Sequence, residues 1–198
     1  MTYPSFYENA SMIRMYDPLS EFLGAFDKGL ITYTYLDAVK CAGHSCPTVA
    51  SAYVMLHKGL DALYTGEIPL RGGIKVFFKE AQNEGVTGVI ANLFSFITGA
   101  TQEGGFKGIA GKFDRRGLLF FNATLSLHVK MQRIDTGKSV ELSCDASSIA
   151  ADSRMNALMP KLLKDATVEE KELFATLWQE RVRKILENAD KIVTLYKD

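Results

Sequence analysis

A proline that follows a short segment containing cysteine and histidine constrains this chain more than any other feature. The segment reads Cys41-Ala-Gly-His44-Ser-Cys46-Pro47. Proline has a fixed φ and no N–H, which suits the first position of a helix, and no further proline or glycine occurs until Gly59. The sequence therefore predicts a helix that begins at Pro47, with Cys46 as its N-cap and His44 just before it.

Cys46 and His44 are candidates for a metal-ligating or reactive site. A sulfur at a helix N-terminus faces unpaired backbone N–H groups and the positive end of the helix dipole, both of which favour the thiolate. A thiolate is a nucleophile or a metal ligand, and sulfur with imidazole favours zinc, iron or copper over magnesium or calcium. Cys41 can join them if Ala42-Gly43 turns the chain. The opposite interpretation, a buried free cysteine beside a hydrogen-bonded core histidine, is the common one for either residue alone.

Composition limits the classes of protein to which this chain can belong. Its 198 residues suit one domain, and 47% apolar with 23% charged residues is ordinary for a globular protein. The formal net charge is zero, so nothing indicates electrostatic binding to nucleic acid or to a membrane. No segment approaches the ~20 apolar residues that span a membrane, and the N-terminus lacks a signal-peptide pattern. Because three cysteines are an odd number, we expect a cytoplasmic protein without a disulfide framework.

Hydrophobic periodicity predicts an α+β fold in a single domain that spans residues 1–198. The predicted strands are residues 31–36, 74–78 and 139–144, together with one long or two short strands within 118–134. The predicted helices are two short ones within residues 5–27 broken near Pro18, one from Pro47 to about Tyr64, one over 86–99, and two after residue 146. Residues 146–198 lack strand character and are interpreted as a helical C-terminal extension of the same domain. Glycine is frequent over 101–117, where we expect a flexible loop.

The last predicted helix and the remaining histidines are less specific signals. That helix opens on a capping box with Thr167 as N-cap and Glu170 at N3, and its apolar stripe is interpreted as core or as a contact between copies. His57 lies about 16 Å along the Pro47 helix from Cys46, at ~1.5 Å per residue, so the two cannot share a metal. His128 lies on the less apolar face of its predicted strand and is a weaker candidate ligand.

With these segments placed, the chain resembles the FmdE family, small proteins that share a domain with one component of formylmethanofuran dehydrogenase and occur in methanogens and many anaerobic bacteria. The resemblance depends mainly on a His-x-Cys-Pro motif at a helix entrance, matched by His44, Cys46 and Pro47. The weaker similarities are Thr98-Gly99 before a glycine-rich loop, Thr136-Gly137-Lys138 in a hairpin, and Trp178 in the last helix.

The resemblance implies an α+β core, a mostly antiparallel sheet packed by helices with C-terminal helices added, in a homodimer. It implies a pocket around the motif that holds a divalent transition metal, zinc above all, with Cys41, His44 and Cys46 as the expected ligands. Three protein ligands would leave a position open for water or a small-molecule ligand. The family name also associates the chain with the other proteins of an oxidoreductase complex in anaerobic one-carbon or redox metabolism, without establishing a reaction.

The chain departs from the family pattern at several positions that bear on the site. These are Ala42 in place of a second histidine, Thr48 in place of the glycine after Cys-Pro, and Ala100 in place of a cysteine in the glycine loop. A C-terminal zinc finger is absent, because a single cysteine follows Cys46. Cys41 is the hypothesised replacement ligand.

Two other functions stay open on the same residues. The first is thiol-based redox catalysis without a metal, in which Cys46 is the catalytic nucleophile, His44 its base and Cys41 the resolving thiol. The second is a non-catalytic assembly subunit of an oxidoreductase complex, which docks through the terminal stripe or the loop over 104–117. Whether the chain is an enzyme is therefore left open.

Overall fold

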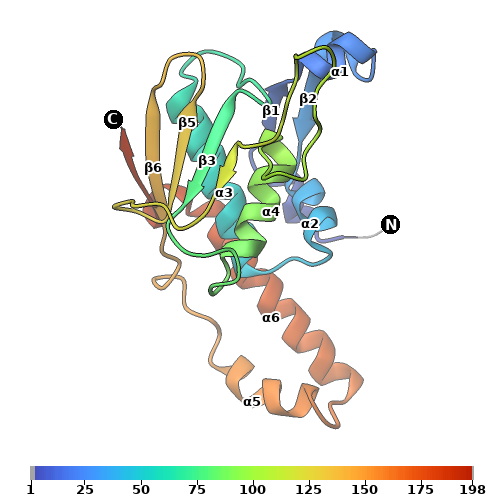
Figure 1. Cartoon of the computed structure of the whole chain (residues 1–198). Helices are drawn as coiled ribbons and strands as arrows, with labels where there is room; N and C mark the ends of the chain where they lie inside the picture. Colours follow the sequence, from blue (N-terminus) through green and yellow to red (C-terminus); the bar gives the residue numbers. More distant parts are fainter. Residues whose placement is uncertain (1–2, 198) are drawn as a thin grey trace.

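Helix α3 (Pro47–Leu63) lies at the centre of the computed structural model, which describes residues 3–197 (Figure 1). It begins at Pro47 with Cys46 as N-cap, as predicted. Apolar side chains are buried along its whole length, because β6 packs on one side of it and α4 and α6 on others. Whatever is attached to its first turn is therefore fixed relative to the core.

The remaining elements surround α3. The helices are α1 (Pro18–Leu23), α2 (Tyr35–Ala42), α4 (Thr87–Thr98), α5 (Arg154–Leu162), α6 (Val168–Glu187) and α7 (Ala189–Ile192), with 3-10 turns η1 (Ser5–Asn9) and η2 (Asp27–Gly29). The strands are β1 (Ile13–Tyr16), β2 (Leu30–Tyr33), β3 (Ile74–Phe78), β4 (Leu119–Phe120), β5 (Val129–Arg133), β6 (Ser139–Cys144) and β7 (Val193–Lys197). No helix among residues 3–197 combines the length and the apolar character needed to cross a membrane.

The main sheet has five strands in the order β4-β3-β5-β6-β7, and β1 pairs with β2 in a separate two-stranded sheet. The pairing of β3 with β4 is parallel, and every other pairing in the two sheets is antiparallel. Along β3 and β5 buried and partly exposed residues alternate, which is the pattern of a sheet covered on one face. The predicted α+β fold with a mostly antiparallel sheet is confirmed.

The N-terminal prediction was wrong in two respects. Residues 5–27 hold the 3-10 turn η1, the strand β1 and a single α-helix, α1, rather than two helices, and the strand expected over 31–36 stops at Tyr33. The residues expected to end that strand instead begin helix α2, because Thr34 and Asp37 form a capping box. Each of the two side chains accepts a hydrogen bond from the other residue's backbone N–H. Cys41 consequently lies on a helix.

The prediction of one long or two short strands over residues 118–134 is confirmed in its second form, as the short β4 and then β5 with irregular chain between them. A further prediction on strands was wrong. Residues 146–198 do contain a strand, because β7 returns antiparallel to β6 after α7. Val193 and Leu195 are partly buried whereas Thr194 and Tyr196 are exposed, which is the alternation of a strand covered on one face.

Helices α5 and α6 extend away from the sheet as a helical arm, shown in orange and red-orange in Figure 1. The predicted capping box of α6 is confirmed, since Thr167 accepts a hydrogen bond from the Glu170 N–H and Glu170 accepts one from the Thr167 N–H. Met155, Leu158 and Leu177 form a small separate core in the arm. Only the second half of α6 joins the main core.

Candidate functional site

The connection between α2 and α3 carries the cysteines and the histidine singled out in the sequence. Helix α2 ends at Gly43, whose φ of 76° is left-handed and whose N–H donates to the Val39 carbonyl. A residue with a side chain would be strained there, so glycine permits the sharp turn that the motif needs. Cys41 lies in the last turn of α2, His44 follows the turn, and Cys46 begins α3.

This connection and α4 enclose a pocket of about 120 Å³. Its lining residues are Cys41, Ala42, His44, Val49, Val89, Asn92 and Leu93. The structure thus brings the Cys41 thiol and the His44 imidazole to one pocket, and the chain turns between them at Ala42-Gly43. It adds the amide of Asn92, a polar residue of the mostly apolar helix α4.

The His44 ring is held by the backbone of Ala42, two residues earlier. Its Nδ1 lies 3.0 Å from the Ala42 carbonyl oxygen, and this oxygen can only accept a hydrogen bond. Nδ1 therefore carries the proton, which leaves Nε2 with a free lone pair. Metal-binding histidines in proteins typically have this arrangement, in which a backbone carbonyl or carboxylate fixes the tautomer of the ring.

The Cys41 thiol is on the exposed side of α2, and its residual burial raises its pKa above the ordinary value. The thiol form is thereby favoured at neutral pH in the absence of a partner. A metal ion would displace the proton, whereas metal-free nucleophilic chemistry needs a lowered pKa.

Cys46 occupies a different environment. It is 9% exposed, packs in the main hydrophobic core and does not line the pocket. Its side chain makes no capping hydrogen bond to α3, so the expected contact between the sulfur and the helix N–H groups is not formed. Within residues 3–197, no three histidine, cysteine or acidic side chains are grouped so that they could hold a metal ion as they stand.

His128 is also outside the pocket. It lies exposed immediately before β5, and its backbone N–H donates to the Leu142 carbonyl at 3.1 Å. His57 forms a pair within α3, where its Nδ1 lies 3.1 Å from the Asp61 carboxylate.

Ser45, between His44 and Cys46, is bound by two residues of α6 that sequence reasoning did not assign to the site. The Trp178 indole N–H donates to the Ser45 carbonyl at 2.9 Å, and the Gln179 amide N–H donates to the same oxygen at 3.2 Å. The Ser45 hydroxyl in turn donates to the Gln179 side-chain oxygen at 3.1 Å. The connection is therefore clamped to a helix more than a hundred residues away in sequence.

Two tyrosines complete this clamp. The Tyr35 hydroxyl lies 3.0 Å from the Ser45 hydroxyl, and burial raises the pKa of Tyr35, which keeps the phenol protonated. Since Ser45 gives its only proton to Gln179, Tyr35 is the donor in its contact with Ser45. Tyr7 also donates to the Gln179 oxygen, at 3.2 Å. A buried indole or phenol needs a hydrogen-bond partner, and this was the one signal in the sequence that could have identified Trp178 as a donor to another segment.

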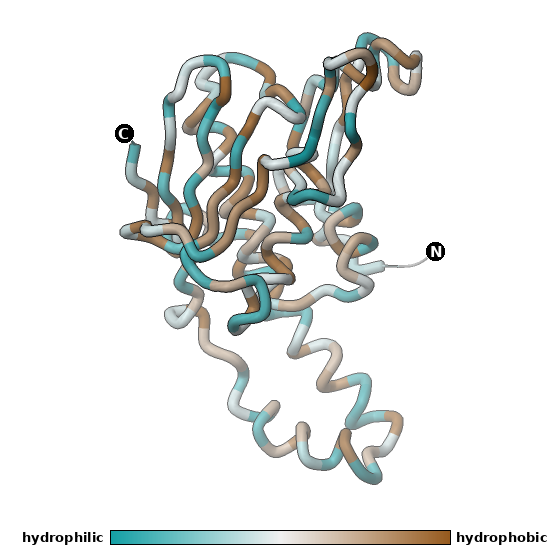
Figure 2. Tube along the Cα trace, viewed as in Figure 1, coloured by the Kyte–Doolittle hydropathy of each residue, from teal (hydrophilic) through white to brown (hydrophobic). Residues whose placement is uncertain are grey.

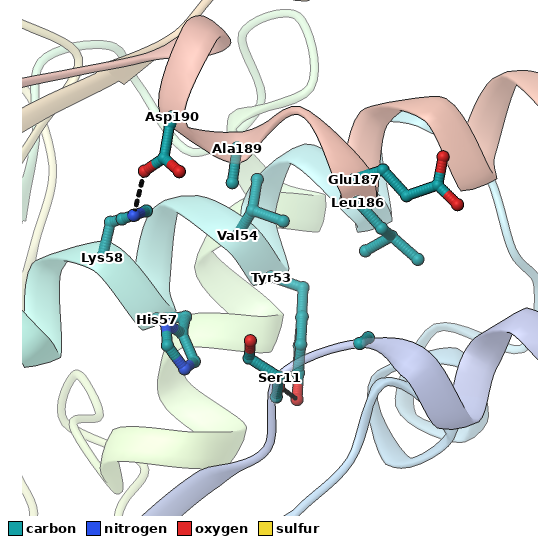
Figure 3. Close-up of a pocket in the computed structure, with 10 residues that line it drawn as sticks. Ser11, Tyr53, Val54, His57, Lys58, Leu186, Glu187, Ala189 and Asp190 are labelled. Carbon is teal, nitrogen blue, oxygen red and sulfur yellow. Dashed lines mark hydrogen bonds and ion pairs between the residues drawn. The ribbon is translucent and has the colours of Figure 1, made fainter.

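A larger cavity of about 230 Å³ lies near the middle of α3, away from the motif (Figure 3). It is enclosed by α3, the chain before β1, and the junction of α6 and α7. The Lys58 ammonium and the Asp190 carboxylate form an ion pair at one side, and His57 and Ser11 lie on the other. None of the predicted ligands lines this cavity.

A family described as "FmdE, Molybdenum formylmethanofuran dehydrogenase operon" matches residues 41–194, so the match begins at Cys41 and runs through α7 into β7. No curated protein matches the chain. Because the match covers well over half of the 198 residues, this protein belongs to the FmdE family.

Proposed function

We propose that this FmdE-family protein binds a divalent transition metal, zinc above all, in the pocket between α2, α3 and α4. One observation carries the proposal: Cys41 and His44 line the same pocket, and the hydrogen bond from His44 Nδ1 to the Ala42 carbonyl leaves Nε2 available. We place the protein in the cytoplasm of an anaerobe, as a homodimer linked to formylmethanofuran dehydrogenase and its one-carbon or redox chemistry.

Cys41 and His44 are the two proposed ligands that already share the pocket. Cys46 is the proposed third ligand, and it would have to turn its side chain out of the core to join them. Asn92 offers an amide oxygen from the opposite wall without any such movement. Bound zinc would supply a Lewis acid, and its open position would admit water or a small-molecule ligand.

Zinc titration of the untagged protein tests this site. We expect about one zinc per chain in the wild type, and a loss of affinity of at least tenfold in Cys41→Ser and in His44→Ala, since each removes a ligand. Cys46→Ser should lose affinity equally if its sulfur is the third ligand, whereas Asn92→Ala should do so if the amide is. Cys144→Ser is the matched control, because Cys144 is a free cysteine of β6 outside the pocket. A wild type that takes up no zinc, or Cys41→Ser and His44→Ala variants with unchanged affinity, would refute the proposal.

Metal-free thiol chemistry finds less support. Burial raises the pKa of the Cys41 thiol, and Cys46 is packed in the core, so neither sulfur is placed as an exposed thiolate. A role in assembly is supported by a separate apolar surface, which lies around α1.

A further inference from the structure

Large apolar side chains are exposed at the end of the molecule where α1 lies beside the loop over 101–117. Figure 1 shows this loop, in yellow-green, running along α1 and β2, and Figure 2 shows hydrophobic residues in both segments. The side chains are Phe22 (64% exposed), Leu23 (59%), Phe26 (52%), Phe106 (43%) and Ile109 (37%), which we call the α1–loop patch. The two segments touch through the rings of Phe22 and Phe113, whose centroids are 5.5 Å apart.

A buried ionic network fixes the two halves of the patch. Asp17, the N-cap of α1, accepts a hydrogen bond from Arg115 of the loop at 2.6 Å and one from Arg71 at 2.9 Å. Arg115 is 5% exposed, and its backbone carbonyl accepts from the N–H and the hydroxyl of Thr101 across the base of the loop. The exposed apolar residues are thus presented by anchored segments, which lowers the ordering cost of binding a partner.

The size of the patch favours a specific contact. At ~200 Å² for each large side chain, the exposed fractions amount to roughly 500 Å² of apolar surface. This is near the upper end of what a typical monomer leaves uncovered, about 300–600 Å², and such patches often mark interaction sites. It would form most of the roughly 800 Å² that each partner buries in a standard interface.

The charges around the patch are divided between its two sides. The side of α1 and η2 carries Glu21, Asp27 and Lys28, so it is net negative. On the loop side Arg116 forms an ion pair with Asp114. The other exposed charged residues of the loop are Glu103, Lys107 and Lys112, which together carry a net positive charge. A surface with one negative and one positive side complements a copy of itself that is turned by a two-fold axis.

We propose that the α1–loop patch is the surface through which a second copy of this chain binds, with the α1 side of each copy against the loop side of the other. This gives the homodimer of the proposed function a surface that does not involve the Cys41 and His44 pocket. Apolar burial would supply the affinity, and the crossed charges would set the orientation.

Charge reversal tests the crossed arrangement. One variant carries Lys107→Glu with Lys112→Glu, and the other carries Glu21→Lys with Asp27→Lys. By sedimentation velocity at tens of micromolar, we expect the wild type to be dimeric and each variant alone to dimerise at least tenfold more weakly. An equimolar mixture of the two variants should form a heterodimer with near-wild-type affinity, because both of its crossed contacts pair opposite charges.

Two further variants separate the patch from other surfaces. Phe22→Ser with Phe26→Ser should give a monomer, whereas Leu163→Ser, at an 81% exposed position after α5, should leave the dimer intact. A monomeric wild type, or a mixture of reversal variants that stays monomeric, would overturn the proposal. Zinc content measured on the same samples tests the dimer surface and the metal site separately. The variants of the α1–loop patch should retain the metal, and the variants of the proposed metal ligands should retain the dimer.

Discussion

Replacing Asp17 by asparagine is expected to lower the free energy of unfolding by about 3–5 kcal/mol, because removal of one partner leaves a buried charge uncompensated. The Asp17 carboxylate is 3% exposed and lies between the guanidinium groups of Arg71 and Arg115. It also accepts hydrogen bonds from the backbone N–H groups of Leu19 and Ser20, which start α1. The Arg115 Nε, already buried without a hydrogen bond, would gain no new partner.

Urea unfolding followed by far-UV circular dichroism measures this change. Asp114→Asn is the matched control, since it breaks the exposed pair with Arg116 and should cost less than about 1 kcal/mol. A second readout is limited trypsin digestion, in which cleavage after Lys107 and Lys112 should be faster in Asp17→Asn than in the control, because the loop has lost its anchor. Equal unfolding energies for the two variants would show that the network does not stabilise the fold.

The parts of the fold that could be predicted are those with local signals. Pro47 located the start of α3, and the capping box of Thr167 and Glu170 located the start of α6, because each signal acts within one helical turn. The box at Thr34 and Asp37 is equally local, but it was overlooked because Ile31, Tyr33 and Tyr35 continue a strand-like alternation across it. Strand β7 was missed for another reason: its pairing with β6 is a long-range contact that follows a helical stretch.

In the candidate site, too, the features set by local sequence were predictable and those set by long-range packing were not. The approach of Cys41 to His44 follows from the turn at Gly43 and was predictable from spacing. The burial of Cys46 was not, since it depends on the core that packs around the start of α3, and the pocket wall at Asn92 comes from α4. The network of Asp17 with two arginines was invisible in the sequence for the same reason, because its members come from three distant segments.

Replacing Trp178 by alanine is expected to lower the free energy of unfolding by about 2–4 kcal/mol, somewhat less than for a fully buried tryptophan because the ring is half-buried. The ring packs against both the main core and the small core of the arm, and it stacks on Phe174 with centroids 5.7 Å apart. Its loss also frees the Ser45 carbonyl from one of its two donors. Since Trp178 is the only tryptophan, unfolding is followed by far-UV circular dichroism rather than by fluorescence.

Trp178→Phe distinguishes the packing of the Trp178 ring from its hydrogen bond to the Ser45 carbonyl. It keeps a smaller aromatic ring between the two cores and removes the N–H donated to Ser45, which Gln179 continues to bind, so it should cost about 1–2 kcal/mol. If the clamp also holds the proposed ligands in place, zinc affinity should fall by on the order of tenfold in folded Trp178→Ala and much less in Trp178→Phe. An alanine variant that loses stability but binds zinc as the wild type does would mean that the turn at Gly43 positions Cys41 and His44 without help from α6.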